Sequence, residues 1–423
     1  MRAAVTRFFA MCLRIFFRRI ELVGLERVPR EGGVVFAVNH PNALVDPLFL
    51  LCFAPRPVSF LAKAPLFRYR FIGLLVRAFD SIPVYRKEDH TTGSHDETFA
   101  RSEAVLRGTG SIAIFPEGTT HDDPQLRELK TGAARIALGS SLPRVAVIPT
   151  GIYYTAKHVF RSDVLVMFGE PLEVVPGDVS VARVDALTAE IDRGLDAVTL
   201  QAESRAALEL IAQAGEIFAS EHELPLAEEL ELRRRFIDGY HYLAARDPQR
   251  LERLQSSVVQ FAGELRRARL DVHDLAPAPL EPRRLFRIAV LLPLALIGAA
   301  VSWPTYRLIG FLARRLTREK AVVATIKFVA ALLFYPLTYL AIAVFVGMRF
   351  GWLPGVAAAL LLPLLGYVAL RVFEDIDEVI GDVRALRHRP RERLIAERER
   401  IRREIADVAR EITAAEPAAP TRG

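Results

Sequence analysis

A histidine and an aspartate stand close together after an apolar run near the start of the chain. The run Val34–Val38 is followed by Asn-His-Pro-Asn-Ala-Leu-Val-Asp, which places an imidazole at His40 and a carboxylate at Asp46. Open α/β sheets bind ligands at the carboxyl ends of their strands, so this position suits reacting groups. A histidine can take the proton from an attacking hydroxyl, and a nearby carboxylate can fix its tautomer. Taken alone, the pair also fits an ordinary turn with a capping aspartate.

A second group of candidate residues follows the apolar run Ile112–Phe115. The sequence Phe-Pro-Glu-Gly-Thr-Thr places a carboxylate at Glu117 and a glycine at Gly118. A glycine lets the backbone approach a ligand closely. The hydroxyl of Thr119 can cap the next segment or bind an oxyanion or phosphate. The alternative is a simple strand-to-loop turn.

Three further stretches carry residue types that could serve a binding site. Arg86 carries a guanidinium that could hold a phosphate through two parallel hydrogen bonds, although a surface arginine is the better explanation when it is taken alone. Val147–Gly151 is another apolar run that ends in proline and glycine, which suits a pocket wall. The run His121-Asp122-Asp123 has no flanking residues at metal-ligand spacing, so we expect solvated loop residues and no metal site.

Taken together, these motifs resemble the glycerolipid acyltransferase family, whose best-known members act on 1-acylglycerol 3-phosphate. That family carries a His/Asp block, an Arg block, a Phe-Pro-Glu-Gly block and a proline-containing block, in this order and at similar distances. All four stand in residues 20–175 of this chain. The resemblance implies that His40 is the general base, oriented by Asp46. It also implies that Arg86, Glu117 and Gly118 help to bind the acceptor's glycerol phosphate. Lys130 matches a basic position downstream of Glu117 and is a weaker candidate for the phosphate, to which Thr119 could add its hydroxyl.

One spacing departs from the usual pattern of the family. Four residues commonly separate the histidine from the aspartate, whereas five separate His40 from Asp46 here. The longer spacing is similar to that of fungal glycerol-3-phosphate and dihydroxyacetone-phosphate acyltransferases. Residues 115–138 and a membrane region after the catalytic domain are similar to theirs as well. This resemblance favours acylation at the sn-1 position.

The expected function is therefore the transfer of a fatty acyl group from acyl-CoA or acyl carrier protein to glycerol 3-phosphate or dihydroxyacetone phosphate in phospholipid biosynthesis. Neither Cys12 nor Cys52 lies in a motif, so direct transfer without an acyl-enzyme or a cofactor is expected. Acylation of 1-acylglycerol 3-phosphate at sn-2 is the alternative within the same enzyme class. A lipid-binding membrane scaffold with a degenerate site is the alternative that is not an enzyme.

The elements that must position these residues read as an α/β domain over residues 23–180, with a mixed sheet flanked by helices. Short apolar runs suit buried strands, and amphipathic stretches such as Glu97–Arg107 and Gly132–Leu138 alternate with them. Residues 1–22 form an amphipathic stretch in which Arg7, Arg14 and Arg18 share one stripe, as in a helix at an anionic membrane surface. A core-packing helix with a basic edge is the alternative. Residues 181–285 read as a helical cap or brace.

The apolar surplus of the chain lies mostly in residues 286–372. The chain is 51% hydrophobic, with a mean hydropathy of +0.22. Phe328–Met348 and Trp352–Leu370 are long enough to span a bilayer as a hairpin. Basic residues at 314–320 and at Arg371 place both ends of that hairpin on the cytoplasmic side, with the catalytic domain. Ile288–Val301 has basic residues on both sides, which favours a re-entrant or interfacial segment over a third span.

The remaining residues are highly charged. Residues 373–413 read as charged helices, in which Ile401, Ile405, Val408 and Ile412 form one heptad-like seam. This seam is long enough for a helix but too short to indicate a coiled coil, and a helix docked on its own catalytic domain is the alternative. Residues 414–423 read as a disordered tail. The net charge of +6 comes without any zinc-finger or RNA-binding signature, so anionic lipid is expected as a partner and nucleic acid is not.

Overall fold

The computed structural model describes residues 2–68, 73, 76–77, 79–85, 95–108, 110–218, 224–268, 270, 272, 275, 281–387 and 391–415. It divides into two compact units, which are taken in turn. The first consists of Met1–Ser204 and Thr317–Thr325, and the second of Arg205–Leu316 and Ile326–Gly423.

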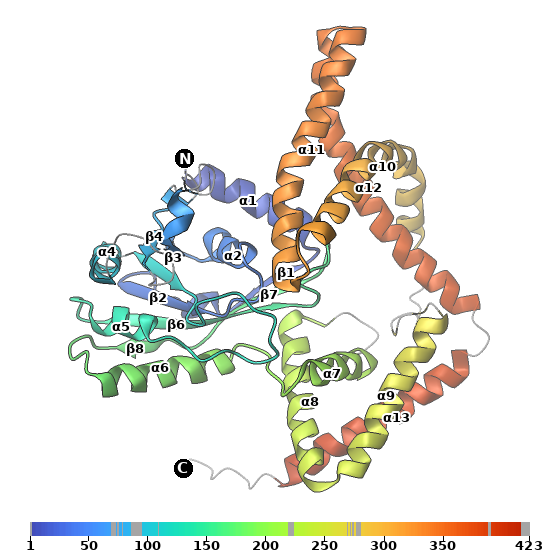
Figure 1. The fold of residues 1–423 in the computed structure, drawn as a ribbon. Coiled ribbons are helices and arrows are strands. Elements are labelled where there is room, and N and C mark those ends of the chain that lie inside the picture. The colour runs from blue at the N-terminus through green and yellow to red at the C-terminus, as the bar shows by residue number, and fades with distance from the viewer. Residues whose placement is uncertain are drawn as a thin grey trace. The chain divides into compact units, whose positions relative to one another are not determined.

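The first unit is built on a mixed sheet of eight described strands in the order β1-β7-β6-β2-β5-β3-β4, with β8 paired to β6 (Figure 1). The strands are β1 (Ile20–Val23), β2 (Gly33–Val38), β3 (Val58–Lys63), β4 (Ile82–Val84), β5 (Ser111–Ile114), β6 (Val145–Tyr154), β7 (Val164–Phe168) and β8 (Leu172–Val174). β2, β3 and β5 lie where apolar runs predict buried strands, and so do β6 and β7. The predicted α/β fold is confirmed.

β2 lies in the middle of the sheet, between β5 and β6. Its position brings together the two motif loops, which are residues 39–46 after β2 and residues 115–120 after β5. It pairs in parallel with β5, Val34 opposite Ser111, and in parallel with β6, Gly33 opposite Val145. All six of its residues are buried. The carboxyl ends of parallel neighbours open at the same edge of a sheet. The residues that follow β2 and β5 are therefore brought to one edge.

Helices cover both faces of this sheet (Figure 1). On one face, α4 (His95–Arg107), α5 (Gly132–Leu138) and α6 (Val181–Asp196) bury an aliphatic core against the odd-numbered side chains of β2 and β6. α6 contributes Val184, Leu187, Ile191 and Leu195 to that core. α6 thus completes this core, and the compact unit extends to Ser204, beyond the boundary expected at residue 180.

On the other face lie α1 (Arg2–Phe16) and α2 (Val45–Phe53). α1 buries Phe9, Ala10, Leu13 and Phe16, so the core-packing alternative describes this side of the helix. Its opposite side exposes Phe8, Met11 and Ile15 beside the exposed arginines Arg7 and Arg14. Arg18 does not continue this stripe. It lies beyond the end of α1 and pairs with Asp163 through two hydrogen bonds of 3.2 and 3.0 Å.

The second unit contains a helical bundle of α7 (Arg205–Phe218), α8 (Leu226–Arg246), α9 (Pro248–Ala268) and α13 (Arg391–Ala415). The seam of α13 is buried inside it: Leu394, Ile401 and Ile405 pack with Phe261 and Leu265 of α9. α13 is therefore docked within its own chain, and its partner is the helical bundle in place of the expected catalytic domain.

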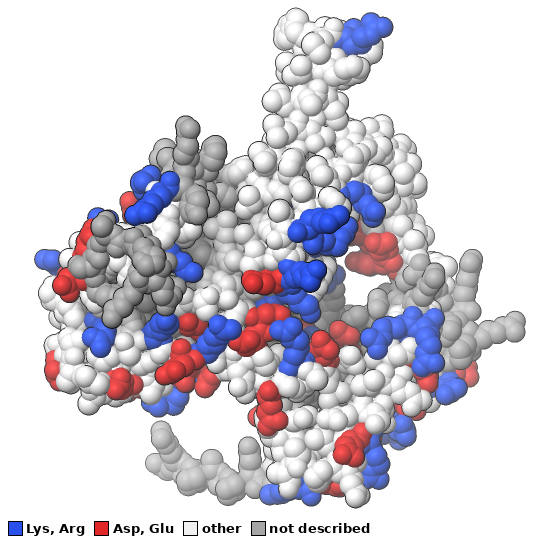
Figure 2. Space-filling model, in the orientation of Figure 1, with Lys and Arg blue, Asp and Glu red and all other residues white. Residues whose placement is uncertain are grey.

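The second unit also contains three helices that are long and apolar enough to cross a membrane: α10 (Pro282–Leu316), α11 (Lys320–Phe350) and α12 (Trp352–Arg387). α11 and α12 are joined at Gly351 and form the tall hairpin of Figure 1. On the face that Figure 2 shows, the upper part of this hairpin is white apart from a blue side chain near its tip. Arg349 is the basic residue that precedes the turn at Gly351 in the sequence.

α10 takes a path of its own beside this hairpin. Its first part runs antiparallel to α12, since Arg287 pairs with Asp375 at 2.8 Å and a side chain on Gly298 would strike the Leu365 carbonyl. Farther along, Thr305 bonds Thr338 of α11 at 2.8 Å. Thr338 lies about 27 Å along α11 from its start, and α10 ends only three residues before that start. The second part of α10 must therefore run back along α11, toward the end of the hairpin that holds the start of α11 and the end of α12.

Candidate functional site

His40 and Asp46 are in direct contact at the sheet edge. The two atoms His40 Nδ1 and Asp46 Oδ2 are 2.9 Å apart. Asp46 is completely buried, whereas the His40 side chain is 15% exposed. Asp46 also accepts the backbone N–H of Asn42 at 2.6 Å and the phenol of Tyr154 at 2.5 Å. With Nδ1 directed at Asp46, Nε2 is the nitrogen that remains to receive a proton from a substrate.

The five-residue spacing between His40 and Asp46 is accommodated by a tight turn. Asn42 accepts the backbone N–H groups of Val45 and Asp46 at 3.0 and 3.3 Å, and Ala43 takes a positive φ of 25°. The N–H of Leu44 in this turn donates to the hydroxyl of Thr325 at 3.1 Å, so the first turns of α11 help to hold it. The longer loop thus reaches the geometry of a histidine–carboxylate pair at the cost of one unfavourable backbone angle.

The imidazole of His40 also has an aromatic support. The ring of Phe115 stacks on it, with centroids 4.0 Å apart and planes 21° apart. Phe115 is the first residue of the Phe-Pro-Glu-Gly motif, at the end of β5. One ring face of His40 is therefore covered, and its orientation is set from β5 as well as from Asp46. Such a stack also favours the cation that forms when the imidazole accepts a proton.

Glu117 ties the two motif loops together. One carboxylate oxygen accepts the backbone N–H of His40 at 3.0 Å, and the other accepts the N–H of Arg127 at 3.0 Å and bonds Nε2 of His121. Glu117 is only 3% exposed. The resemblance implies a role for Glu117 in acceptor binding, whereas these contacts show it fastening the His40 loop to the Phe-Pro-Glu-Gly loop.

Gly118 and Lys130 lie against each other. Gly118 has a φ of +74°, and a Cβ at this position would come within 2.9 Å of Cε of Lys130. The backbone N–H of Lys130 donates to the Pro116 carbonyl at 2.8 Å, which fixes the lysine beside the loop. Lys130 is exposed and Thr119 is half-buried, so both are accessible next to the motif. Arg86 lies outside the described residues.

Three residues of this site were missed by sequence reasoning. His121 is 8% exposed on its side chain and bonds Glu117, so the expectation of a solvated loop residue is wrong. Its spacing of four residues from Glu117 was an available signal. Lys157 pairs with Asp122 and donates to the Pro41 carbonyl at 3.2 Å, which braces the His40 turn from another loop. Tyr154 stands on β6, more than a hundred residues from Asp46, and no local pattern marks it.

The two cysteines lie on the α1 and α2 side of the unit, away from the motif loops in sequence. Burial is the main cause that raises the pKa of Cys52 to about 12, and burial also raises the pKa of Cys12. Both thiols therefore stay protonated near neutral pH and are poor nucleophiles.

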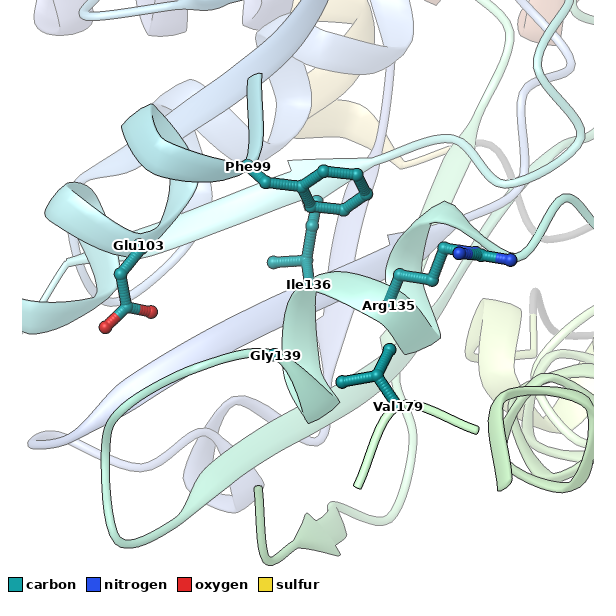
Figure 3. Close-up of a pocket in the computed structure, with 6 residues that line it drawn as sticks. All are labelled: Phe99, Glu103, Arg135, Ile136, Gly139 and Val179. Carbon is teal, nitrogen blue, oxygen red and sulfur yellow. The ribbon is translucent and has the colours of Figure 1, made fainter. Parts of the chain in front are cut away.

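A small hollow lies elsewhere on the same unit. Its accessible volume is about 170 Å³, and Figure 3 shows side chains of α4 and α5 around it, among them Phe99, Glu103 and Ile136. No residue of either motif loop lines it. Glu103 at its edge already accepts the backbone N–H of Ser141 at 3.0 Å. The hollow therefore does not belong to the site around His40.

Two family models match the chain. The acyltransferase model matches residues 19–153, and the model of the glycerol-3-phosphate acyltransferase 2 C-terminal domain matches residues 211–416. The first covers strands β1 to β5, β6 up to Tyr153, and both motif loops. The second covers the helical bundle and the three apolar helices.

Curated relatives match over different lengths. An acyltransferase of Schizosaccharomyces pombe, described as uncharacterized, is 27% identical and covers 63% of this chain. Glycerol-3-phosphate O-acyltransferase 1 of Saccharomyces cerevisiae is 25% identical and covers 77%. The chain spans 54% and 58% of the lengths of these two proteins. The 1-acyl-sn-glycerol-3-phosphate acyltransferase of Borreliella burgdorferi is 29% identical, covering 34% of this chain and 57% of its own.

Proposed function

We propose that this chain, which carries an acyltransferase domain followed by a glycerol-3-phosphate acyltransferase 2 C-terminal domain, is a membrane O-acyltransferase that acylates a glycerol-phosphate acceptor. The observation that carries the proposal is the contact of His40 with the buried Asp46, held beside the Phe-Pro-Glu-Gly loop by Glu117. The acyl donor is acyl-CoA or acyl carrier protein, and no cofactor takes part.

The geometry supports a direct transfer. The acceptor hydroxyl gives its proton to Nε2 of His40 as its oxygen attacks the thioester carbonyl. Asp46 stabilises the imidazolium that forms. The tetrahedral intermediate then expels the thiolate, which receives the proton back from His40. A covalent acyl-enzyme is not needed, and the protonated thiols of Cys12 and Cys52 argue against one.

The acceptor's phosphate is assigned to cations near the motif loops. Lys130 supports this assignment because it is exposed and lies directly against Gly118. Arg86 is proposed as the second cation, on the basis of the family resemblance. Thr119 offers a hydroxyl to the same group. Gly118 leaves the backbone open to the ligand, and Glu117 acts by holding the loop.

The acceptor is proposed to be glycerol 3-phosphate or dihydroxyacetone phosphate, acylated at sn-1. The glycerol-3-phosphate relative from yeast aligns with 77% of the chain, whereas the 1-acylglycerol-3-phosphate relative aligns with 34%. The part of the chain beyond the catalytic domain is thus shared with the former. Acylation of 1-acylglycerol 3-phosphate at sn-2 is the competing assignment. Its support is the bacterial relative of that name, which aligns with 34% of this chain.

The chain is proposed to work on the cytoplasmic side of a membrane. The three apolar helices support membrane association. The exposed Phe8, Met11 and Ile15 of α1, next to Arg7 and Arg14, suit a contact with anionic lipid. The basic residues at 314–320 support the cytoplasmic assignment of the hairpin ends.

The test is an acyl-transfer assay of the full chain in detergent with three acceptors: glycerol 3-phosphate, dihydroxyacetone phosphate and 1-acylglycerol 3-phosphate. The highest kcat/KM is expected with one of the first two. His40→Ala should lower turnover by about 10²–10⁴-fold without loss of fold, because a general base supplies roughly that factor. Preference for 1-acylglycerol 3-phosphate would contradict the sn-1 assignment, and full turnover of His40→Ala would contradict the mechanism.

A further inference from the structure

The carboxylate that orients His40 has a second side-chain donor. The phenol of Tyr154, at the end of β6, donates to Asp46 Oδ1 at 2.5 Å, while Nδ1 of His40 contacts Asp46 Oδ2 at 2.9 Å. Each carboxylate oxygen therefore has its own side-chain partner. A carboxylate held at both oxygens cannot rotate freely, so its contact with the imidazole has a fixed direction.

The phenol is held in place by aromatic packing. Its ring contacts Phe17, which follows α1, with centroids 5.8 Å apart, and Phe49 of α2, with centroids 6.0 Å apart. Phe17 and Phe49 are themselves completely buried. Burial, followed by the charge of Asp46, raises the pKa of Tyr154 well above its ordinary value. The phenol therefore keeps its proton near neutral pH and remains a donor.

We propose that Tyr154 is a positioning residue of the acyl-transfer site, which sets the orientation of Asp46 and lowers the basicity of His40. The proposal rests on the proposed function, because it gives Tyr154 a part in the proton transfer at His40. The O–H of Tyr154 draws negative charge of Asp46 away from the imidazolium. Its removal should therefore strengthen the attraction between Asp46 and protonated His40, and raise the pKa of the imidazole.

Other ionisable groups lie around His40 and would remain unchanged in this experiment. Glu117 accepts the backbone N–H of His40, His121 bonds Glu117, and Lys157 donates to the Pro41 carbonyl. Asp122 pairs with Lys157, and Asp123 lies beside both His121 and Arg127. Lys130 lies against Gly118 in the adjoining loop. The altered residue would leave all of these groups in place. A shift seen only on altering Tyr154 can thus be assigned to its own hydrogen bond.

The test compares Tyr154→Phe with Tyr153→Phe in the full chain in detergent. Tyr153 is the next residue on β6, so its side chain points to the opposite face of the sheet. The rate at which diethyl pyrocarbonate modifies His40 is followed against pH by mass spectrometry. The pH at which the modification rate of His40 reaches half of its maximum should rise by about half a unit in Tyr154→Phe. This midpoint should stay unchanged in Tyr153→Phe. A midpoint equal to that of the wild type would overturn the proposal.

Two further measurements complete the test. In Tyr154→Phe, kcat should fall about three- to tenfold with little change in the acceptor KM. 3-Fluorotyrosine at position 154, a stronger donor that keeps the ring in place, should move the His40 midpoint downward, and an upward or absent shift would overturn the proposal. The midpoint is read without substrate. If the enzyme acylated none of the three acceptors, the proposed function would be refuted. The pH midpoint of His40 modification would still decide the role of Tyr154.

Discussion

At the scale of single residues, Asp46 combines a structural and a chemical role. A buried carboxylate is costly unless hydrogen bonds compensate for lost water, and Asp46 receives three donors from three places in the chain. Two of them, Asn42 and Tyr154, would remain if His40 were lost. The carboxylate is thus held in place before the imidazole uses it, which is the preorganisation that a general base requires.

The backbone at Ala43 provides a test of the turn at this scale. Its φ of 25° is unfavourable for any side chain and most of all for a β-branched one. Ala43→Val should lower the free energy of unfolding by about 1–3 kcal/mol and reduce acyl transfer, because the turn carries Asp46. Ala104→Val, at an exposed position of α4, is the matched control and should cost only a few tenths of a kcal/mol. Thermal unfolding gives both values, and equal costs would show that the turn is relaxed.

Arg86 lies outside the described residues, so its role stays a prediction. Arg86→Lys should raise the KM of the acceptor far more than the KM of the acyl donor, because an ammonium cannot reproduce a two-pronged contact with phosphate. Arg107→Lys, on the exposed side of α4, is the control and should change neither constant. Steady-state kinetics with each substrate varied in turn would decide. Equal effects on both substrates would remove Arg86 from the acceptor site.

At the scale of elements, the pairing of β2 with β5 and β6 brings the chemistry together. β5 delivers Phe115 and Glu117 to His40, and β6 delivers Tyr154 to Asp46. The parallel strands β2, β5 and β6 thus carry His40, Phe115 and Tyr154. Together with Asp46, these residues make the side-chain contacts of the imidazole and of the carboxylate that are described above. A change that shifts any of the three strands should affect catalysis even where it touches no motif residue.

The helix α13 allows a second test at this scale. Ile401 is fully buried in the bundle of the second unit, whereas Ile395 on the same helix is 37% exposed. Ile401→Asp should lower the free energy of unfolding of the bundle by about 3 kcal/mol or more, because it buries an unpaired charge. Ile395→Asp should have little effect. Faster cleavage of residues 205–268 in limited proteolysis would report the loss of stability of the bundle. A change in oligomer size without loss of protection would point to a coiled coil between chains.

At the scale of the whole molecule, the course of α10 bears on topology. Its packing along α12 and its return toward the start of α11 bring Pro282 and Leu316 toward the same end of the hairpin. The hydroxyls of Ser302 and Tyr339, 3.1 Å apart, satisfy each other where α10 changes partner, as polar groups in a membrane must. This packing supports a helix that enters and leaves from one face, although its length alone would allow a crossing.

Labelling can test this arrangement. Single cysteines at positions 285, 317, 350 and 400 are introduced into a chain with Cys12 and Cys52 replaced by alanine. The label at 350 should react only from outside, and those at 317 and 400 only from the cytoplasm, because basic residues hold both hairpin ends inside. The label at 285 should match 317. Labelling of 285 and 317 from opposite sides would make α10 a true span and would move the catalytic domain or the hairpin to the other side.

The sequence by itself determined the features that are encoded locally. Apolar runs of four to six residues gave the central strands, helical periodicity gave α4 and α5, and composition gave the three apolar helices. It also placed His40 and Asp46 after a strand, because residue type and spacing within one loop are read directly from the chain. These features depend on neighbours within about ten positions, which is the range over which periodicity and turn chemistry act.

Only the tertiary structure decided which distant residues meet. The order of strands in the sheet puts β6 beside β2, and that order alone brings Tyr154 to Asp46 across 108 positions. The place of α6 in the first unit and the return of α10 depend on packing in the same way. No local pattern carries this information, because the free energy that selects it comes from burying surfaces contributed by separate parts of the chain.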